Sequence, residues 1–283
     1  MSKYERILEL PPGLNRQGQG GLRTRGVFKK GTPEQPLISV ITVVFNGEDF
    51  LEQTILSVLD QSYPHLEFII VDGGSNDRSL EIIRKYQDRI DYWVSEKDQG
   101  ISDAFNKGVR LAAGDYINFQ GDGDGFVTAN TLEALFAEVN IKTDILISAQ
   151  VKRIDLQDKV LYVSRYHPFR KTSLLFRMSL PHQGLFTHRK MFEDFGLFDV
   201  KNKFCMDYDL LLRAYDQFPV VKVSKQAVAN WRADGLGMGK TLQILKEYDL
   251  IKRKNQVASS PILTLLYYWS VFKFRIKQML GAA

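Results

Sequence analysis

Residues 37–72 read LISVITVVFNGEDFLEQTILSVLDQSYPHLEFIIVD, and this stretch decides the fold class of the chain. It opens with a short run dense in β-branched residues and closes with a second such run, EFIIVD, which is typical of strands buried on both faces of a sheet. Between the two runs, Leu51, Ile55 and Val58 recur at helical spacing. The stretch therefore predicts a strand, a helix and a second strand.

The same cycle continues along the chain. The run EFIIVD is followed by the helical run RSLEIIRKYQ, DYWVS is followed by ISDAFNKGVRLAAG, and DYINF is followed by a cluster of Gly and Asp. Alternating buried strands and helices predict an α/β fold with a mixed, mostly parallel sheet flanked by helices. In such sheets, ligands bind beyond the carboxyl ends of the strands.

Acidic residues follow each of the four predicted strands, in the loops FNGED, VDGGSND, SEKDQG and QGDGDG. Asp, Asn and Gly also form turns and helix caps, which is the plainer interpretation of any one loop. Four such loops at one sheet edge would repel one another unless cations or hydrogen-bond donors offset the charge. A divalent metal ion is therefore predicted at this edge.

Charge is unevenly distributed along the 283 residues. Residues 1–36 hold seven Lys or Arg against three Glu, residues 251–283 hold six against no acidic residue, and residues 37–250 hold 25 against 30. Basic tails on an acidic body suit a membrane surface or a phosphorylated ligand better than a nucleic-acid groove. We therefore expect no nucleic-acid partner.

Three segments are expected from these patterns. Residues 1–36 are predicted to be a flexible basic arm, because residues 11–36 are rich in Gly, Gln, Pro and Arg and show no apolar periodicity. Residues 37–250 would form the main domain, and residues 251–283 a C-terminal helical extension.

The C-terminal extension contains ILTLLYYWSVF, 11 residues that would be about 16 Å long as a helix. A hydrocarbon core is about 30 Å thick, so this run cannot span it. It is followed by KFRIK, and Tyr267, Tyr268 and Trp269 suit the headgroup region, so we predict an amphipathic helix that docks at a membrane surface. Packing on the main domain or in a homo-oligomer is the alternative.

The single cysteine, Cys205, excludes an intrachain disulfide and a metal site of clustered thiolates. The opening residues MSKYERILEL carry charges where a secretory signal has an apolar core, and no stretch of 18 residues is continuously apolar. We expect a cytoplasmic protein, either free or held peripherally on the cytoplasmic face of a membrane.

Six segments, in this order, resemble family 2 of the glycosyltransferases across roughly residues 37–236. They are SVITVVFN, SVLDQSYPHLEFIIVDGGSNDRS, SEKDQGISDAFNKG, GDYINFQGDGD, PHQGLFTHRK and FCMDYDLLLR. The resemblance is to bacterial polysaccharide transferases of the colanic-acid type. It implies the GT-A fold and transfer of a sugar from a nucleotide diphosphate to an acceptor hydroxyl, and it says little about which sugar is transferred.

The resemblance assigns the nucleotide to the first loops. By resemblance, the residues that line the base and ribose are Thr42, Val43, Phe45 and Glu48. Asp72 would accept a hydrogen bond from the uracil N3–H, which suits a carboxylate. Ser75 and Asp77 follow in the same loop, where turning the chain and capping a helix are the alternatives. Asp98 and Asn106 resemble family positions near the nucleotide or the donor sugar.

Asp122 and Asp124 form a DxD motif in the segment QGDGD. Alternate side chains of an extended turn can face one ligand. One Mn²⁺ or Mg²⁺ held there by oxygen ligands would neutralise the charge that develops on the departing nucleoside diphosphate. The sequence departs from the commoner family pattern at Gly123, where an acidic residue often stands, so two carboxylates are left to hold the ion.

A base must take the proton of the acceptor hydroxyl as that hydroxyl attacks the anomeric carbon. Asp207, in CMDYDLLLR, resembles the acidic residue of the family that opens a helix, and we expect it to be this base. Met206 stands where the family frequently has Glu, so Asp209 is a competing candidate. Its side chain would point about 200° away from that of Asp207 on a helix. A single displacement of this kind inverts the anomeric configuration.

His182, in PHQGLFTHRK, would by resemblance stand near the diphosphate or the acceptor entrance, with a structural role as the alternative. The residues Trp231, Arg232 and Asp234 match loosely a loop that closes on the phosphates in relatives.

The sequence thus predicts an inverting transferase that uses a UDP-sugar and extends a surface polysaccharide or a lipid-linked acceptor. Two rival functions remain open: a sugar-phosphate nucleotidyltransferase, for which a Gly-rich basic loop after the first strand is missing, and a nucleotide-sugar-binding subunit without catalysis.

Overall fold

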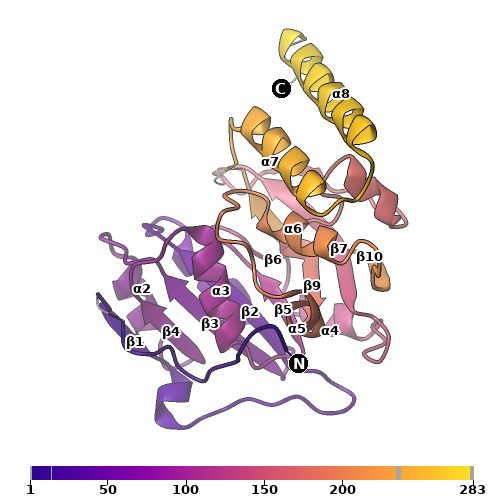
Figure 1. Cartoon of the computed structure of the whole chain (residues 1–283). Helices are drawn as coiled ribbons and strands as arrows, with labels where there is room; N and C mark the ends of the chain where they lie inside the picture. Colours follow the sequence, from indigo (N-terminus) through magenta and orange to yellow (C-terminus); the bar gives the residue numbers. More distant parts are fainter. Residues whose placement is uncertain (1, 14, 234–236, 281–283) are drawn as a thin grey trace.

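The computed structural model describes residues 2–13, 15–233 and 237–280. Within these residues, ten strands form one mixed sheet in the order β1-β4-β3-β2-β5-β9-β7-β10-β6, with β8 paired to β7 (Figure 1). The strands are β1 Gly18–Gly20, β2 Ile38–Val44, β3 Leu66–Asp72, β4 Tyr92–Ser95, β5 Tyr116–Phe119, β6 Gly125–Phe126, β7 Leu146–Ile154, β8 Val160–Val163, β9 Leu185–His188 and β10 Val221–Arg232.

Eight α-helices and three short 3-10 helices join and cover these strands in the described residues. The α-helices are α1 Leu51–Leu59, α2 Ser79–Lys85, α3 Ile101–Leu111, α4 Thr131–Phe136, α5 Lys190–Phe195, α6 Met206–Arg213, α7 Thr241–Lys254 and α8 Ser260–Met279. The 3-10 helices are η1 Leu22–Arg25, η2 Lys171–Leu175 and η3 His182–Gly184.

Strands β2 to β5 form the parallel part of the sheet. β2 pairs with β3 on one side and β5 on the other, and β4 pairs with β3, all in parallel. Every residue of β2 and β3 is buried because helices cover both faces: Ile41 packs in one core with Phe105 of α3, and Val40 packs in another with Ile55 of α1. The expected α/β fold with a mixed, mostly parallel sheet is confirmed.

In the second half of the sheet, the turn that follows β5 contacts the end of β10. β9 is antiparallel to both β5 and β7, and β7 runs parallel to β10. The two-residue strand β6 follows directly after the DxD motif and pairs with Ala229 and Asn230 of β10. The DxD turn is therefore held between two strands that lie far apart in the sequence.

The N-terminal segment, which the sequence predicts to be a flexible arm, lies on the main domain in the structure. Gly18–Gly20 form β1, an edge strand antiparallel to β4. Leu10 is buried in the core that α3 covers, and the buried Arg23 forms an ion pair with Glu67 of β3. Edge-strand hydrogen bonds and one buried ion pair hold this segment, and neither produces apolar periodicity in the sequence.

The C-terminal helices α7 and α8 pack against each other, and α8 extends away from the sheet (Figure 1). The expected domain boundary at residue 250 falls inside α7. Within the described residues, none of the helices has the length and apolar character that crossing a membrane requires.

Candidate active site

The DxD turn begins where β5 ends. The backbone N–H of Asp124 donates to the carbonyl of Gly121 over 3.0 Å, and Gly123 between the two aspartates has a φ of +84°. L-residues with a side chain rarely adopt this left-handed region. A Cβ at residue 123 would also lie 3.1 Å from Cδ of Arg232. The glycine that departs from the commoner family pattern is therefore required by the shape of this turn.

Asp124 is buried, with 9% of its surface exposed. Its Oδ2 accepts from Nε2 of Gln183 over 2.9 Å and from the backbone N–H of Gly121 over 3.2 Å, and its Oδ1 accepts from the backbone N–H of Arg232 over 3.0 Å. Burial raises the pKa of Asp124 to about 6, although the Gln183 and Arg232 hydrogen bonds act in the opposite direction. The carboxylate is thus fixed in place, and its charge is only partly compensated.

The side chain of Arg232 also stabilises the DxD turn. Its Nε donates to the carbonyl of Gly123 over 3.2 Å, one terminal nitrogen donates to Gln53 over 2.9 Å, and its guanidinium lies 4.1 Å from the centre of the Phe50 ring. The sequence associates Arg232 and Trp231 with a phosphate-closing loop. The structure places both in β10 instead, and Asp234 lies outside the described residues.

Asp122 extends toward the first loop of the sheet edge. A Cβ built on Gly47 would overlap with the Asp122 carboxylate, so this glycine leaves the room that the side chain occupies. Asp122 of the DxD motif therefore lies against the loop at residue 47, and Asp124 lies against the η3 helix at residue 183.

The loops that follow β2 and β3 are joined by hydrogen bonds between side chains of one loop and the backbone of the other. Ser75 Oγ accepts from the backbone N–H of Asn46 over 2.8 Å, and Asp77 accepts from those of Glu48 over 3.0 Å and Ser79 over 2.9 Å. Glu48 in turn forms an ion pair with Arg78 at 3.1 Å. Ser75 and Asp77 thus shape the loops, as the turn and cap alternatives expect.

The predicted base and ribose residues divide into exposed and buried ones. Phe45 is 61% exposed at the sheet edge, and Glu48 is partly exposed beside it. Thr42 and Val43 are buried within β2. Phe45 and Glu48 are therefore accessible at this edge, whereas Thr42 and Val43 lie inside the sheet.

Asp72 and Asn106 are engaged inside the protein. Asp72 is fully buried, and its carboxylate accepts from the hydroxyls of Ser75 and Ser95. The amide of Asn106 exchanges two hydrogen bonds with the backbone of Phe198, at 2.8 and 2.9 Å. A uracil would find no exposed oxygen on Asp72 here, because the serine hydroxyls that shape the loop occupy the carboxylate. Asp98 is half-buried and lies against the backbone of Gly73 at the same sheet edge.

Asp207 and Asp209 point to different environments. Asp207 lies in the first turn of α6, its Oδ2 is 3.3 Å from Nδ1 of His182, and it lines a cavity. Asp209 is fully buried and forms ion pairs with Arg213 at 3.3 Å and Lys254 at 3.2 Å. Of the two candidate bases, Asp207 is the one that borders open space.

The 3-10 helix η3 contacts both the DxD motif and Asp207. Its Gln183 hydrogen-bonds Asp124 of the DxD motif, while its His182 contacts Asp207 and stacks on Phe119 at 5.4 Å between ring centres. The carbonyl of Gln183 accepts from Asn118 at the end of β5. Gln183 lies within the segment PHQGLFTHRK, but its functional contact was not predicted from the sequence. A neutral amide next to the more conspicuous His182 carries little signal of its own.

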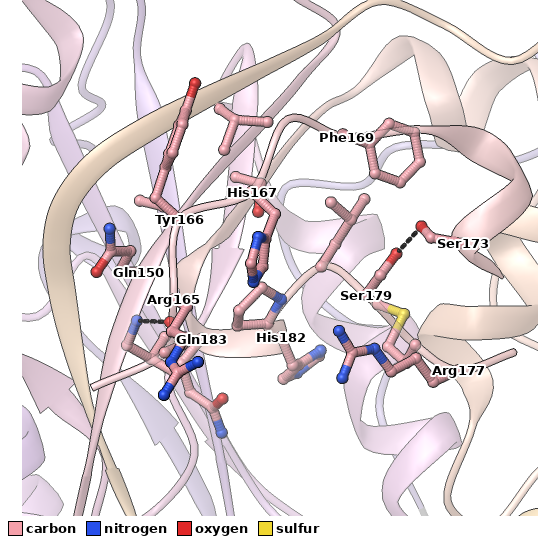
Figure 2. A pocket seen from close by; sticks show the side chains of 18 of the residues that line it. Gln150, Arg165, Tyr166, His167, Phe169, Ser173, Arg177, Ser179, His182 and Gln183 are labelled. Carbon is pink, nitrogen blue, oxygen red and sulfur yellow. Dashed lines mark hydrogen bonds between the residues drawn. The ribbon is translucent and has the colours of Figure 1, made fainter. Parts of the chain in front are cut away.

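A cavity of about 800 Å³ opens beside Asp207 (Figure 2). His182 and Gln183 form part of its wall, and the rest comes from β7, β8, the segments 164–169 and 177–181, and single residues of β10 and α7. The loops at residues 45–50 and 73–79 do not line it, and neither do Asp122 and Asp124 of the DxD motif. The cavity beside Asp207 is therefore separate from the sheet edge at which these loops lie.

The carboxylate oxygens of the DxD motif are the kind of ligand that a hard divalent cation prefers. In the described residues, no group of three or more His, Cys, Asp or Glu side chains is placed to hold a metal. Asp122 and Asp124 are the two carboxylates that would hold a cation at this turn. Mg²⁺ sites on phosphate substrates commonly take one or two carboxylates, with phosphate oxygens and water as the other ligands. Burial of the Asp124 carboxylate is unfavourable for its charged form and raises its pKa. A cation beside this carboxylate would offset that cost.

This fold and this site together define a class, the GT-A glycosyltransferases. Residues 39–200, more than half of the chain, match "Glycosyl transferase family 2". The chain belongs to this family. The Bacillus subtilis "Putative teichuronic acid biosynthesis glycosyltransferase TuaG" is 42% identical over 93 residues, which are 32% of this chain and 37% of that protein. The chain spans 40%, 57% and 37% of the first three curated relatives that it matches.

Two solved structures show the same fold. S. aureus TarS 1–349 in complex with UDP-GlcNAc has a TM-score of 0.61 at 15% identity, covering 83% of this chain and 71% of that chain. The mannosyltransferase PcManGT from Pyrobaculum calidifontis in complex with GDP-Man and Mn²⁺ has a TM-score of 0.61 at 18% identity, covering 82% and 69%. Both are proteins to which this chain is similar in fold.

Proposed function

We propose that this chain is an inverting glycosyltransferase that moves a sugar from a UDP-sugar to an acceptor hydroxyl in surface polysaccharide or glycolipid synthesis. The observation that supports this most is η3, which contacts Asp124 of the DxD motif through Gln183 and Asp207 through His182. Family membership supports the sugar transfer, the UDP-GlcNAc complex of TarS supports the nucleotide, and the name of TuaG supports the pathway class.

In the proposed mechanism, Asp207 accepts the proton of the acceptor hydroxyl while that oxygen forms the new bond to the anomeric carbon. The bond from this carbon to the phosphate oxygen breaks, and its electron pair leaves with the nucleoside diphosphate. His182 holds the Asp207 carboxylate in position. Mn²⁺ or Mg²⁺, when held by Asp122 and Asp124, supplies positive charge to the diphosphate. A single displacement inverts the anomeric configuration.

The variant Asp207→Asn tests the base. The amide keeps the shape of the side chain and cannot take a proton, so we expect transfer to fall by about 10²- to 10⁴-fold while UDP binding in the presence of Mn²⁺ is retained. Asp216→Asn, an exposed residue after α6 that does not line the cavity, is the matched control. Unchanged transfer in Asp207→Asn, or a product of retained anomeric configuration by NMR, would contradict the mechanism.

Two rival functions predict other results from the same protein. A sugar-phosphate nucleotidyltransferase would join a sugar 1-phosphate to a nucleoside triphosphate and release pyrophosphate. A nucleotide-sugar-binding subunit would bind the donor and neither transfer nor hydrolyse it. Screening a panel of nucleotide sugars for metal-dependent hydrolysis separates these outcomes and identifies the donor.

We also propose that α8 docks on an anionic membrane surface and so brings the site to a lipid-linked acceptor. Apolar residues alternate at steps of three and four along this helix and are exposed. They are Ile262, Leu265, Trp269, Phe272, Ile276 and Met279. The helix also carries Lys273, Arg275 and Lys277 and no acidic residue. Charge complementarity favours anionic lipid over a second, equally basic copy of the helix.

A further inference from the structure

The cavity beyond Asp207 provides a place for the acceptor that is separate from the nucleotide edge. Under the proposed function, the acceptor hydroxyl must approach Asp207 from the side opposite the leaving diphosphate. Gln183 links the cavity to the DxD motif, because it hydrogen-bonds Asp124 and also lines the cavity. A volume of about 800 Å³ is large enough for more than one sugar ring.

Two arginines on the cavity wall indicate which chemical class of acceptor fits. Arg165 and Arg177 both line the cavity and are exposed, and in the view of Figure 2 their guanidinium groups lie on either side of His182. Among the interactions of residues 2–13, 15–233 and 237–280, neither guanidinium has an ion pair or a hydrogen bond. Elsewhere in the protein, Arg16, Arg23 and Arg232 are paired with carboxylates.

The charge of the cavity wall is not balanced by acidic residues. Of its described lining residues, Asp207 is the one carboxylate, and His182 already contacts it. Two guanidinium groups are thus left without a counter-charge beside the proposed reaction centre. The planar guanidinium binds phosphate and carboxylate groups through two parallel hydrogen bonds, so the wall is suited to an anion.

The remaining wall suits a sugar. Tyr166, Phe169, Trp231 and Tyr248 line the cavity with aromatic rings, which offer flat apolar faces with polar edges. The guanidinium of Arg153 lies 4.7 Å from the centre of the Trp231 ring and holds that ring in place. The cavity wall, with its aromatic rings and two unpaired guanidinium groups, thus differs in charge from the proposed nucleotide edge, where Glu48 and Asp98 lie.

We infer that this cavity binds a negatively charged acceptor, a sugar whose phosphate or carboxylate group is held by Arg165 and Arg177 while its hydroxyl faces Asp207. The inference deepens the proposed function and rests on it. A phosphate-linked sugar and a uronic acid share the required chemistry, and the test distinguishes them.

The test measures binding rather than transfer, so it does not depend on turnover. Three probes, N-acetylglucosamine 1-phosphate, glucuronic acid and neutral N-acetylglucosamine, are titrated into the full-length protein by ligand-detected NMR. Saturating UDP and Mg²⁺, which is diamagnetic, keep the donor site filled. We expect at least one anionic probe to bind about tenfold or more tightly than the neutral one, because each charge-assisted hydrogen bond stabilises the complex.

The double variant Arg165→Gln/Arg177→Gln should lose this preference and bind the neutral sugar as the unmodified protein does. Arg170→Gln is the matched control, because Arg170 is an exposed arginine of the same segment that does not line the cavity. Equal binding of charged and neutral probes, or an equal loss in Arg170→Gln, would overturn the inference. Absence of transfer with binding preference intact would instead count against the proposed function alone.

Discussion

At the scale of single residues, Gly123 links backbone geometry to the proposed metal site. Its φ of +84° turns the chain between Asp122 and Asp124, and its missing Cβ leaves room for the side chain of Arg232. An acidic residue at position 123, which would be the third, would strain the backbone and crowd the arginine that holds the turn. Two carboxylates rather than three therefore follow from the local conformation.

The variant Gly123→Ala should lower both stability and transfer. A side chain at this φ costs about 1–2 kcal/mol, and the contact with Arg232 would displace the turn that positions the aspartates. Gly26→Ala is the control, because Gly26 has a φ of +80° with open space around its Cβ position and lies away from the site. It should show a comparable loss in urea unfolding with transfer unchanged. Full transfer by Gly123→Ala would argue against the role of the turn.

Asp207 and Asp209 lie on the same helix but have different chemical environments. On α6 they are two residues apart, so they face different sides of the helix. One borders the cavity, and the other is enclosed by Arg213, Lys254 and Asn255. Sequence alone left both as candidates, because the spacing of two acidic residues does not say which side of a helix is buried.

At the scale of elements, η3 has more influence on the site than its three residues suggest. It is fixed to β5 by the hydrogen bonds that Asn118 and Gln120 donate to the carbonyl of Gln183. From this position it contacts Asp124 on one side and Asp207 on the other. A short 3-10 helix has no apolar periodicity, so the sequence could suggest His182 only through the family resemblance.

The helix α8 carries a prediction about membranes. The triple variant Leu265→Ser/Trp269→Ser/Phe272→Ser should lose binding to vesicles that contain phosphatidylglycerol, because the exposed apolar face would no longer enter the interface. Vesicles of phosphatidylcholine alone should bind the unmodified protein more weakly. Vesicle sedimentation measures both effects, and nucleotide binding should be unchanged.

The matched control for α8 replaces three exposed apolar residues elsewhere, in Leu156→Ser/Val200→Ser/Val220→Ser. These changes also remove exposed apolar surface, at positions away from α8, and should leave vesicle binding intact. A protein that ignores anionic vesicles and forms a dimer dependent on the apolar face of α8 would show that the helix binds a second copy of the chain instead.

At the scale of the whole molecule, the N-terminal segment belongs to the folded body in the structure. Arg23 and Glu67 form an ion pair with 3% of each side chain exposed, and Arg23 also donates to the carbonyls of Leu8 and Leu111. Glu67 accepts further from Ser39 and Ala113. One arginine thus joins the segment before β1 to β3 and to the end of α3.

Arg23→Met should destabilise the fold by about 3–5 kcal/mol, because it leaves the Glu67 carboxylate buried without its partner. The double variant Arg23→Met/Glu67→Gln should recover part of this loss. Arg25→Met is the control, since its ion pair with Asp88 is exposed and should contribute about 1 kcal/mol or less. Urea unfolding measures all three, and equal effects of the Arg23 and Arg25 changes would contradict the proposed anchoring.

The alternating strands and helices, the parallel sheet and the acidic loops at its carboxyl edge were all determined by sequence alone. These features depend on apolar runs and turn residues that are local in the chain, and burial of a strand or a helix face requires the same periodicity wherever the element lies. The resemblance to family 2 was likewise determined by sequence alone, because it depends on short segments and on their order along the chain.

Tertiary structure alone decided which polar groups meet. It brought Gln183 to Asp124, placed the Ser95 hydroxyl on the Asp72 carboxylate and placed Arg165 on the wall of the Asp207 cavity. These contacts join residues far apart in the chain, and their geometry depends on strand order and side-chain direction. No local pattern encodes either quantity, because a hydrogen bond of a polar side chain leaves no periodicity in the sequence.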